Sequence, residues 1–522
     1  MYAVEFKKKL WLLILVSTIA RLLIAGCLEL GNDEVYYQTY ALHLQWNYFD
    51  HPPMIALLIR ATTLNGLLHR ELFIRLGAVI CAAADTLLVF SIVKKIGNER
   101  SGWFAACLFT FSFYSSVIAG AFILPDAPML LFWLLSIRLM ISVVEGKVSG
   151  VYWILLGISI GCCIMSKIHG VFLWIGFGGY ILSERRALLK SPWFYISLLV
   201  SLIVISPIFY WNFANHFITY TYHKSRIGFF GKKLDFTSLL QQVLGSVFYN
   251  NPVNFVFYLL MGVSLYVGKI VFPPLYKIFL WLSLPLILVI LVMSFFNETL
   301  PHWSGPAYTS LLLLAGVYLD KITRPASSPS LLKVSGTVFL FVVVMGILAI
   351  HFMPVSIGSA DEKNLGKGDI TLDMTGWEGF SRRFDSLYLA DMRSGAIKPG
   401  ATILSDYWFP AAHLDHYLAQ PYNLNILAIG PLQDIHHYAW MNGYRKQIKS
   451  GEDAYFIYPS NYYGPPKSSL KNCFERTEDS IVFTQYRSGK PVRNFVIYRL
   501  HGALPERLRQ LSEGLAVPGI GN

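Results

Sequence analysis

Long apolar runs separated by short polar segments dominate the first two-thirds of the chain. A helix needs about 20 mostly apolar residues to cross a bilayer. Eleven runs come close enough to that length to predict membrane-spanning helices. They are residues 10–28, 72–93, 102–119, 127–144, 150–165, 168–183, 192–211, 252–271, 275–296, 303–319 and 331–353. The pattern therefore predicts a polytopic α-helical membrane protein.

Three long polar segments interrupt or follow these runs. Residues 29–71 and 212–250 are aromatic-rich loops, and 354–522 form a polar C-terminal region. We therefore expect a transmembrane domain at 1–353, which includes both loops, and an α/β domain at 354–522. Short β-rich stretches in the C-terminal region predict strands, and one stretch predicts a helix. The strands are Ala401–Leu404, Ala454–Tyr458, Ser480–Tyr486 and Asn494–Tyr498, and the helix is Ala411–Leu418.

The composition supports a membrane protein. Hydrophobic residues make up 54% of the chain and charged residues 14%, whereas soluble proteins carry about 25% charged residues. The formal net charge is +12. In a soluble chain such a charge would favour nucleic-acid binding. Here the charge lies mostly in short loops between apolar runs, so we expect membrane lipids as partners and no nucleic acid.

The basic residues predict an orientation, because cytoplasmic loops are enriched in Lys and Arg. With the N-terminus in the cytoplasm, fifteen basic residues lie in cytoplasmic segments and seven in the opposite loops. This places both long loops and the C-terminal domain outside. Only residues 166–169 separate the fifth and sixth runs, and one broken helix there would invert every later segment. The cytoplasmic set is Lys7, Lys8, Lys9, Lys94, Lys95, Arg100, Lys147, Arg185, Arg186, Lys190, Lys269, Lys277, Lys321, Arg324 and Lys333.

Two adjacent acids, Asp33 and Glu34, follow the first apolar run and precede Tyr36 and Tyr37. Neighbouring helical side chains point about 100° apart, so one acid can face a cavity while the other does not. Partial desolvation would raise a carboxyl pKa and suit a general base. The alternative is a solvated helix N-terminus, where the helix dipole favours acids.

Two further acids stand at predicted turns. Asp50 and His51 precede two prolines, which predicts either a histidine presented to an anion or a simple loop corner. Asp126 stands between the third and fourth runs. It is a candidate cavity residue, or an N-cap for the helix that follows.

Cations and aromatic residues complete the external candidates. Lys167 lies in the short break between two apolar runs, and Arg226 lies in the second long loop. Each can bind a lipid phosphate, and a lysine can also reach the headgroups from within the bilayer. His302 and Trp303 begin the tenth run and are either site residues or an aromatic belt anchor. Inside the second run, Asp85 is either functional or a polar contact between helices.

Motifs for nucleotides and metals are missing from the sequence. It contains no H-E-x-x-H run, no paired C-x-x-C, no P-loop and no G-x-G-x-x-G after a strand. An ATP-driven pump and a nucleotide-sugar enzyme therefore have no support, and a donor would arrive through the lipid. We expect no required cofactor, and a divalent metal remains open.

Taken together and in this order, these signals resemble a known family. The chain resembles the bacterial branch of the protein O-mannosyltransferase superfamily of GT-C glycosyltransferases, to which the lipid A aminoarabinose and galacturonic acid transferases also belong. The resemblance covers about residues 1–320, and more loosely the C-terminal domain. It rests on Asp33-Glu34, Tyr36-Tyr37, Tyr48–Pro53, Asp126–Pro128, Lys167, His302-Trp303 and Gly305–Tyr308, then Ser405–Tyr407, Ala411-Ala412 and Tyr417-Leu418.

The resemblance implies transfer of a sugar from a polyprenyl phosphate to an acceptor outside the cytoplasm. It implies Asp33 as the general base, Glu34 as a residue shaping the site, and Asp126 as support for the cavity. It also implies that Lys167 binds the carrier phosphate. His51 and Arg226 are implied as further contacts to the carrier phosphate. The implied cavity residues are Tyr36, Tyr37, Asp50, His302 and Trp303.

Two positions depart from the family pattern. His51 stands where the aminoarabinose transferases carry a phosphate-binding lysine, and histidine titrates near neutrality. Residues 250–252 (Asn-Asn-Pro) occupy a region where those relatives carry an arginine, for which Arg226 is the candidate substitute.

Three functions are weighed. The preferred one is an inverting polyprenyl-phosphate-sugar glycosyltransferase of the bacterial inner membrane, acting as a monomer with its active site facing the periplasm. A transporter or flippase of a polyprenyl-linked glycan would show inverted repeats, and the Asp33 and Asp126 motifs occur once. A non-catalytic receptor would leave the acids of the first loop unexplained. The sugar and the acceptor, whether lipid A, glycan or protein, stay open.

Overall fold

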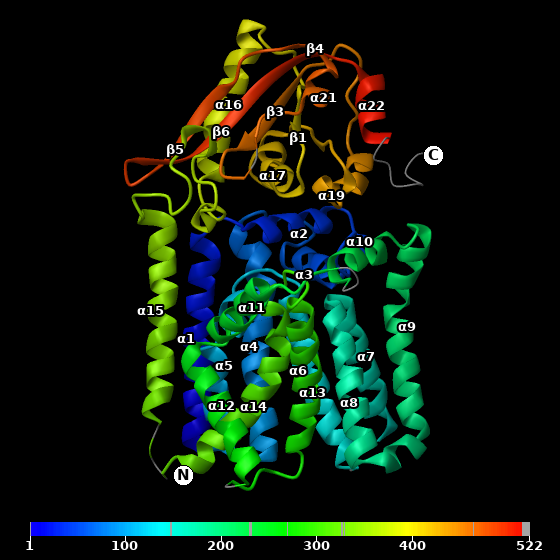
Figure 1. Cartoon of the computed structure of the whole chain (residues 1–522), viewed down its shortest axis with the longest axis vertical. Helices are drawn as coiled ribbons and strands as arrows, with labels where there is room; N and C mark the ends of the chain where they lie inside the picture. Colours follow the sequence, from blue (N-terminus) through cyan, green and yellow to red (C-terminus); the bar gives the residue numbers. More distant parts are fainter. Residues whose placement is uncertain are drawn as a thin grey trace. The chain divides into compact units, whose positions relative to one another are not determined.

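The computed structural model describes residues 2–146, 149–228, 232–268, 270–324, 327, 329–462 and 464–513, with only the backbone at 2–4, 225–227 and 512–513. The chain forms two compact units (Figure 1). The membrane unit is Met1–Cys27 with Leu44–Val343, and the C-terminal unit is Leu28–His43 with Val344–Asn522. This division differs from the expected boundary at residue 353, because the start of the first loop belongs with the C-terminal unit.

Helices build the membrane unit, and each apolar run coincides with a helical segment. Among the residues that the structure describes, six helices are long and apolar enough to cross a membrane: Glu5–Cys27 within α1, and α4, α6, α9, α13 and α15. Two shorter apolar helices are α7 and α12. The bounds are α1 Tyr2–Cys27, α3 Met54–Thr62, α4 Glu71–Ile96, α5 Glu99–Thr110, α6 Asp126–Val144, α7 Gly150–Ser166, α8 Val171–Glu184, α9 Pro192–Ala214, α10 Ile218–Ile227, α11 Phe236–Tyr249, α12 Pro252–Val267, α13 Tyr276–Ser294, α14 Gly305–Ile322 and α15 Ser330–Phe352.

One apolar run is not a single helix. The run expected at 102–119 contains α5, which ends at Thr110, and a π-helical turn, η1, at Tyr114–Ile118. The hydroxyls of Ser115 and Ser116 donate to the carbonyl oxygens of Phe109 and Thr110. Side-chain hydroxyls therefore satisfy carbonyls at the end of α5, and this local bonding competes with continuation of the helix.

The short break at 166–169 separates two helices that fold back on each other. The rings of Trp153 in α7 and Phe177 in α8 lie 6.4 Å apart. In one continuous helix these positions would be about 36 Å apart, at about 1.5 Å per residue. At Gly170, a Cβ would lie 2.6 Å from the backbone nitrogen of Ile164, so the turn needs glycine there. The fifth and sixth runs are therefore separate helices, as the expected orientation requires.

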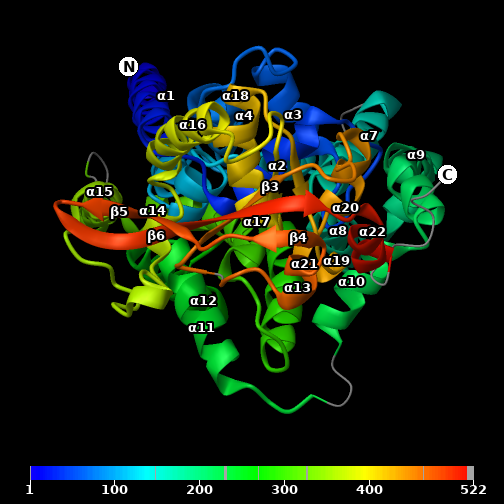
Figure 2. The same ribbon diagram turned by 90° about the horizontal axis from the view of Figure 1, so that it is seen from above.

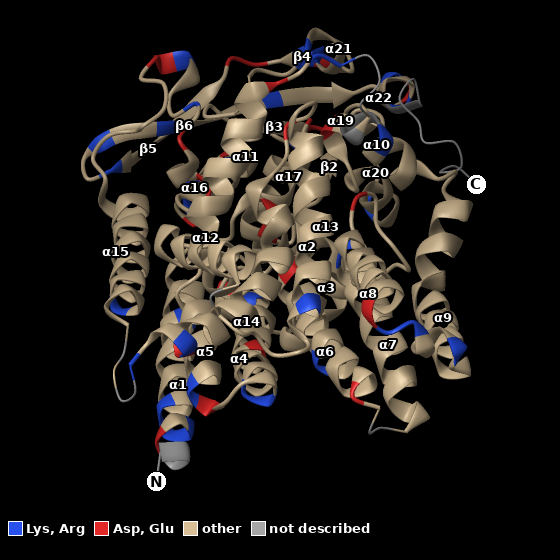
Figure 3. Ribbon diagram, turned by 60° about the horizontal axis from the view of Figure 1, so that its bottom comes forward, with Lys and Arg blue, Asp and Glu red and all other residues tan. Residues whose placement is uncertain are grey.

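Ion pairs bring the ends of several helices together within the membrane unit. Lys94 at the end of α4 pairs with Glu99 at the start of α5 at 2.5 Å, and Lys95 pairs with Glu145 after α6 at 2.7 Å. Arg100 in α5 pairs with Asp320 in α14 at 3.4 Å. These helix ends all belong to segments expected in the cytoplasm. Basic residues also gather near the N-terminal end of α1 (Figure 3). Lys147 and Lys269 of the expected set lie outside the described residues.

A mixed sheet forms the core of the C-terminal unit (Figure 2). Its strand order is β2-β1-β3-β6-β4, and β5 also pairs with β6. Strand β1 runs parallel to β2 and β3, whereas β6 runs antiparallel to β3, β4 and β5. The bounds are β1 Thr402–Ser405, β2 Ile426–Ala428, β3 Ala454–Pro459, β4 Phe474–Thr477, β5 Ile481–Arg487 and β6 Lys490–Ala503.

The helices of this unit come from both ends of its sequence. They include α2 Asn32–Leu42, α16 Trp377–Ser394, α17 Trp408–Leu414, which continues as a π-helical turn over Asp415–Ala419, α19 Leu432–Ile435, α20 Tyr438–Met441 and α22 Pro505–Glu513. The four expected strands coincide with β1, β3, β5 and β6, and the expected helix coincides with α17 and its π-helical turn. Strands β2 and β4 were not expected from the sequence.

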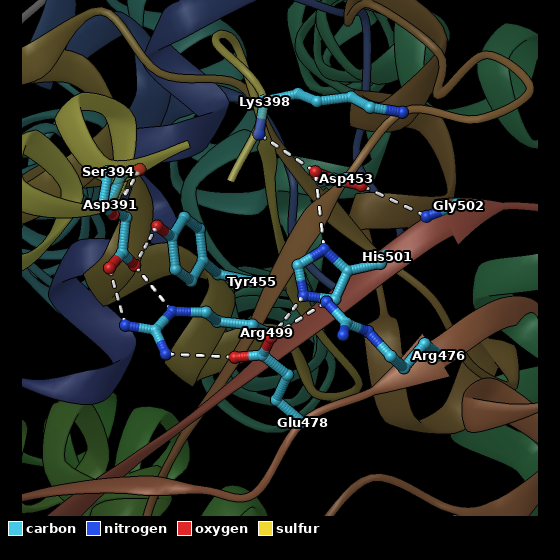
Figure 4. Close-up of polar contacts among 10 residues, drawn as sticks. All are labelled: Asp391, Ser394, Lys398, Asp453, Tyr455, Arg476, Glu478, Arg499, His501 and Gly502. Carbon is cyan, nitrogen blue, oxygen red and sulfur yellow. Dashed lines mark hydrogen bonds and ion pairs between the residues drawn. The ribbon is translucent and has the colours of Figure 1, made fainter. Parts of the chain in front are cut away.

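A polar network ties α16 to the sheet (Figure 4). Arg499 on β6 donates to both carboxylate oxygens of Asp391, at 2.7 and 2.6 Å, and also to Glu478 at 3.1 Å. The Tyr455 hydroxyl on β3 donates to Asp391 at 2.7 Å. Since all of these groups satisfy one another, we assign this network a structural role.

Candidate functional site

A buried ion pair stands at the centre of the candidate site in the membrane unit. Lys167 Nζ donates to Asp126 Oδ2 at 2.7 Å, and the Tyr114 hydroxyl donates to Asp126 Oδ1 at 3.0 Å. Asp126 is 1% exposed and Lys167 is 5% exposed. Both carboxylate oxygens thus accept from side chains outside α6, and Pro125 is the N-cap residue of that helix. Asp126 is therefore more than the helix cap that the sequence also allowed.

The local sequence explains how these three side chains meet. Asp126 is the first residue of α6, and Lys167 is the C-cap of α7, where the chain turns back into α8. Tyr114 begins the π-helical turn η1. At Gly305, the first residue of α14, a Cβ would lie 2.3 Å from the Tyr114 ring. The close approach of Tyr114 to α14 therefore depends on a residue without a side chain.

Histidines surround this pair. His302 interacts electrostatically with Asp126, Lys167 and His51. Burial, with a further contribution from Lys167, lowers the pKa of His302 to about 4. His302 is therefore a neutral imidazole near pH 7, able to donate or accept one hydrogen bond. The membrane unit thus brings together Asp126, Lys167, His51 and His302, all of which were site candidates.

Aromatic rings border the same group. Trp303 lies 5.9 Å from the ring of His169, and Tyr249 lies 6.1 Å from the ring of His302. His169 and Tyr249 were not among the expected site residues, and neither was Tyr114. His169 had a signal, since it stands two positions after Lys167. Tyr114 and Tyr249 lie within or beside apolar stretches and had none.

The Asp50-His51 turn is fixed by local contacts. Asp50 Oδ2 lies 3.5 Å from His51 Nδ1, and the His51 carbonyl accepts from the backbone nitrogen of Tyr48 at 3.2 Å. A ring nitrogen of His223 in α10 lies 3.1 Å from the Asp50 carbonyl oxygen. Helix α10 also carries Arg226, whose side chain lies outside the described residues.

Asn251, in the region where the resemblance led us to expect an arginine, has a structural part. Asn251, the N-cap of α12, donates from its side-chain amide to the carbonyl oxygens of Phe111 and Ser335, at 2.9 and 3.0 Å.

Asp85, in α4, is fully buried and interacts electrostatically with Arg21 of α1. No pattern in the sequence connects Asp85 with Arg21.

The acidic pair lies in the C-terminal unit, on the first turn of α2. Glu34 is buried, and its carboxylate accepts from the backbone nitrogen of Gly31 at 2.9 Å. Glu34 therefore stands at a helix N-terminus, as the alternative interpretation predicted, and it closes the first turn of α2. Asp33 is exposed.

Tyr36 and Tyr37 are buried in an aromatic cluster of the same unit. The ring of Tyr36 lies 4.7 Å from Trp408 and 5.0 Å from Tyr40. Its hydroxyl oxygen accepts from the backbone nitrogen of His437 at 3.1 Å. Tyr37 packs 5.6 Å from Tyr40. Tyr36 thus fixes α2 to the rest of the C-terminal unit, and the place of both tyrosines as cavity residues stays a prediction.

A metal site would need several ligating side chains close together. In the described ranges, no group of three or more His, Cys, Asp or Glu side chains is arranged to hold a metal ion. The site in the membrane unit offers the Lys167 ammonium, held by Asp126, and the imidazoles of His51 and His302. These groups suit binding of an anionic group with hydrogen bonds.

Known proteins resemble this chain in sequence. A family model described as dolichyl-phosphate-mannose-protein mannosyltransferase matches residues 50–211. The lipid A galacturonosyltransferase RgtD of Rhizobium johnstonii is 22% identical over 346 residues, which cover 65% of this chain and 71% of that protein.

Solved structures resemble it in fold. ArnT from Cupriavidus metallidurans in the apo state matches with a TM-score of 0.59 and 14% identity, over 94% of this chain and 98% of that one. The structure of the same ArnT bound to undecaprenyl phosphate matches with a TM-score of 0.59 and 15% identity, over 95% and 98%. These matches confirm the resemblance drawn from the sequence: the chain is a helical membrane protein with a GT-C glycosyltransferase fold, similar to lipid A-modifying enzymes.

Proposed function

We propose that the protein transfers a sugar from a polyprenyl phosphate carrier to an acceptor outside the cytoplasm. The observation that carries the proposal is the buried Lys167–Asp126 pair with His51 and His302 around it, on a GT-C fold. A similar fold has been solved with undecaprenyl phosphate bound. The RgtD relative, named a lipid A galacturonosyltransferase, makes lipid A the first acceptor to test, ahead of another glycan or a protein hydroxyl.

The reaction needs a base and a way to stabilise the leaving phosphate. The acceptor oxygen forms a bond to the anomeric carbon while the bond from that carbon to the phosphate oxygen breaks. The electron pair leaves with the polyprenyl phosphate, and the acceptor proton passes to Asp33. A single displacement of this kind inverts the anomeric carbon. Asp33 has the exposure that a base needs to meet an acceptor, whereas Glu34 holds the turn beside it.

Lys167 is the proposed contact to the carrier phosphate. We assign the same role to His51 and Arg226. A positive group held in a low-dielectric site stabilises negative charge that develops on a leaving group. Asp126 and Tyr114 fix the Lys167 ammonium in place before any ligand binds. Asp126 thus acts by orienting the cation. We place the active site and the C-terminal unit on the periplasmic side of the bacterial inner membrane, in a monomer.

The experiment is transfer by purified protein in detergent, with a panel of labelled polyprenyl-phosphate sugars and lipid A or an envelope extract as acceptor. Wild type is compared with Lys167→Ala, and Lys277→Ala is the matched control. Lys277 is also paired with a carboxylate, Glu184, at 2.8 Å, but lies in a segment expected in the cytoplasm. We expect Lys167→Ala to lose donor binding and Lys277→Ala to keep it. Each reaction is repeated with a metal chelator.

Equal donor binding by both lysine variants would contradict the phosphate contact. Binding of a lipid-linked sugar by wild type with no transfer to any acceptor would instead favour a transporter or flippase of polyprenyl-linked glycans.

A further inference from the structure

The chain segment directly before Asp33 is tied to the C-terminal sequence. The Glu29 carboxylate accepts from the backbone nitrogens of Trp377 and Glu378, at 2.8 and 3.2 Å. These are the first backbone N–H groups of α16, where the helix dipole favours a negative charge. The backbone nitrogen of Leu30 donates to the Tyr417 hydroxyl at 2.7 Å. The chain that leads into Asp33 is therefore held by α16 and by the π-helical turn after α17.

Asn32, directly before Asp33, makes the most specific of these contacts. Its Oδ1 lies 3.0 Å from Nε2 of His413 in α17. Its side chain also hydrogen-bonds to Asp373 and Tyr462. Burial lowers the pKa of His413 well below its usual value, so the imidazole is neutral. Since an amide oxygen only accepts, the His413 proton is on Nε2, and the Asn32 amide group remains to donate to the Asp373 carboxylate.

The partners of Asn32 are themselves fixed. The His413 ring stacks on Trp377 with 4.1 Å between centroids and 2° between planes. The Tyr462 hydroxyl donates to Asp373 at 2.8 Å. The buried Arg493 guanidinium donates to the carbonyl oxygens of Leu372 and Thr375, at 3.0 and 2.6 Å, on either side of Asp373. A rigid arrangement of this kind is what holds a reactive group within a fraction of an ångström.

We propose that Asn32, His413 and Asp373 are positioning residues through which the C-terminal unit sets the place of Asp33. The inference rests on the proposed function, because it takes Asp33 as the base. It gives the C-terminal unit a part in the reaction: the unit includes α2 and orients its first turn.

Asp373 also interacts with Asp33 through its charge. The pKa of Asp373 is raised to about 6: burial raises it most, the hydrogen bonds from Tyr462 and Asn32 and the charge of Arg493 lower it, and the charge of Asp33 raises it. The Asp373 carboxylate, which accepts from Asn32, therefore also lies within electrostatic range of the proposed base.

The first test removes the acceptor for the Asn32 amide and measures kcat and the donor KM for sugar transfer by the full chain. Asp373→Ala cannot accept from Asn32, so kcat should fall about tenfold, with the donor KM within about twofold. Asp406→Ala is the matched control, because burial also raises the pKa of Asp406 to about 6, and Asp406 lies in the same unit. Unchanged kcat in Asp373→Ala, or an equal fall in Asp406→Ala, overturns the positioning role of Asp373.

The second test separates position from folding. His413→Phe retains an aromatic ring beside Trp377 but cannot donate to Asn32, whereas His413→Gln can donate. We expect His413→Phe to lower kcat about tenfold, the effect of about 1.4 kcal/mol, with the donor KM within about twofold. His413→Gln should recover most of kcat. Equal kcat in the two variants, or a rise in donor KM that matches the fall in kcat, would contradict the assignment.

Hydrogen exchange of the peptide that covers α2 distinguishes this inference from the proposed function. Loss of the His413 contact should speed exchange in His413→Phe whether or not sugar is transferred. Faster exchange with no transfer by wild type would mean that the proposed function fails while α2 is still held as described. Unchanged exchange would overturn the positioning role itself.

Discussion

A lysine and an aspartate that are both almost fully buried depend on each other. The sequence could identify Asp126 and Lys167 as candidates, because ionisable residues beside apolar runs are rare and often functional. It could not show that they pair, since 41 positions separate them along the chain. The sequence also could not show that the Tyr114 hydroxyl donates a hydrogen bond to the Asp126 carboxylate.

Removing one member of this pair should destabilise the protein more than removing both. Asp126→Asn leaves an unpaired buried ammonium and should cost about 3–5 kcal/mol, the usual effect of breaking a buried pair. The double variant Asp126→Asn with Lys167→Met should recover most of the lost stability, but no transfer activity. Thermal unfolding in detergent, with the sugar-transfer assay beside it, measures both effects. A double variant as unstable as Asp126→Asn would argue against a paired role.

Glu34 illustrates a second limit at the residue scale. Spacing alone did not show which of the two adjacent acids faces a cavity, but in the structure the Glu34 carboxylate accepts from the backbone nitrogen of Gly31. Gln serves at this position of a capping box as Glu does. Glu34→Gln should therefore keep transfer within about threefold of wild type, whereas Glu34→Ala should lose helix stability of about 1 kcal/mol. A loss of activity in Glu34→Gln as large as in Asp33→Asn would instead mean that the Glu34 charge takes part in the reaction.

At the scale of elements, apolar length and strand pattern gave most of the helices and the longer strands. The missed strands β2 and β4 are three and four residues long, too short for a pattern of alternation to stand out. The break after α5 was missed because apolar residues continue through it. Its cause is local hydrogen bonding by Ser115 and Ser116, which a hydropathy pattern does not register.

The start of α14 offers a test of how elements set the site. Gly305→Ala places a methyl group where the Tyr114 ring now lies. We expect the ring to shift and its hydrogen bond to Asp126 to weaken, with a loss of about 1–3 kcal/mol in stability, as for other overpacked cores, and lower transfer activity. Gly262→Ala, in α12, is the control, since a Cβ there meets no atom within 4 Å. Similar behaviour of the two variants would contradict the packing argument.

At the scale of the whole molecule, the sequence predicted two domains, but it could not predict that residues 28–43 belong with the second one. Residues 28–43 follow the first membrane helix directly, yet they belong with a sheet whose strands begin at residue 402. The contacts responsible, from Glu29 to Trp377 and from Asn32 to His413, join residues more than 300 positions apart. No local pattern of hydrophobic or charged residues can report such a pairing.

The C-terminal unit should lose stability as pH rises from about 4 to above 6. Burial raises the pKa of Asp406 from 3.8 to about 6. The Asp406 carboxyl therefore ionises at lower pH in the unfolded chain than in the folded chain. Its contribution to the free energy of unfolding falls between these two pKa values and is constant above the higher one. Asp406→Asn removes this ionisation. The difference in Tm between Asp406→Asn and wild type should therefore increase from pH 4 to pH 7.5, by about 2–4 °C for each kcal/mol of relative stability. A difference in Tm that is independent of pH would contradict the assignment.

The central claim is that this chain transfers a sugar with Asp33 as the base. The most direct measurement is single-turnover transfer from a labelled polyprenyl-phosphate sugar, in wild type and Asp33→Asn, with donor binding measured on the same samples. We predict transfer by wild type, unchanged donor binding by the variant, and a rate lowered by about 10²–10⁴, the usual contribution of a general base. Equal rates of transfer in the two proteins would contradict the account.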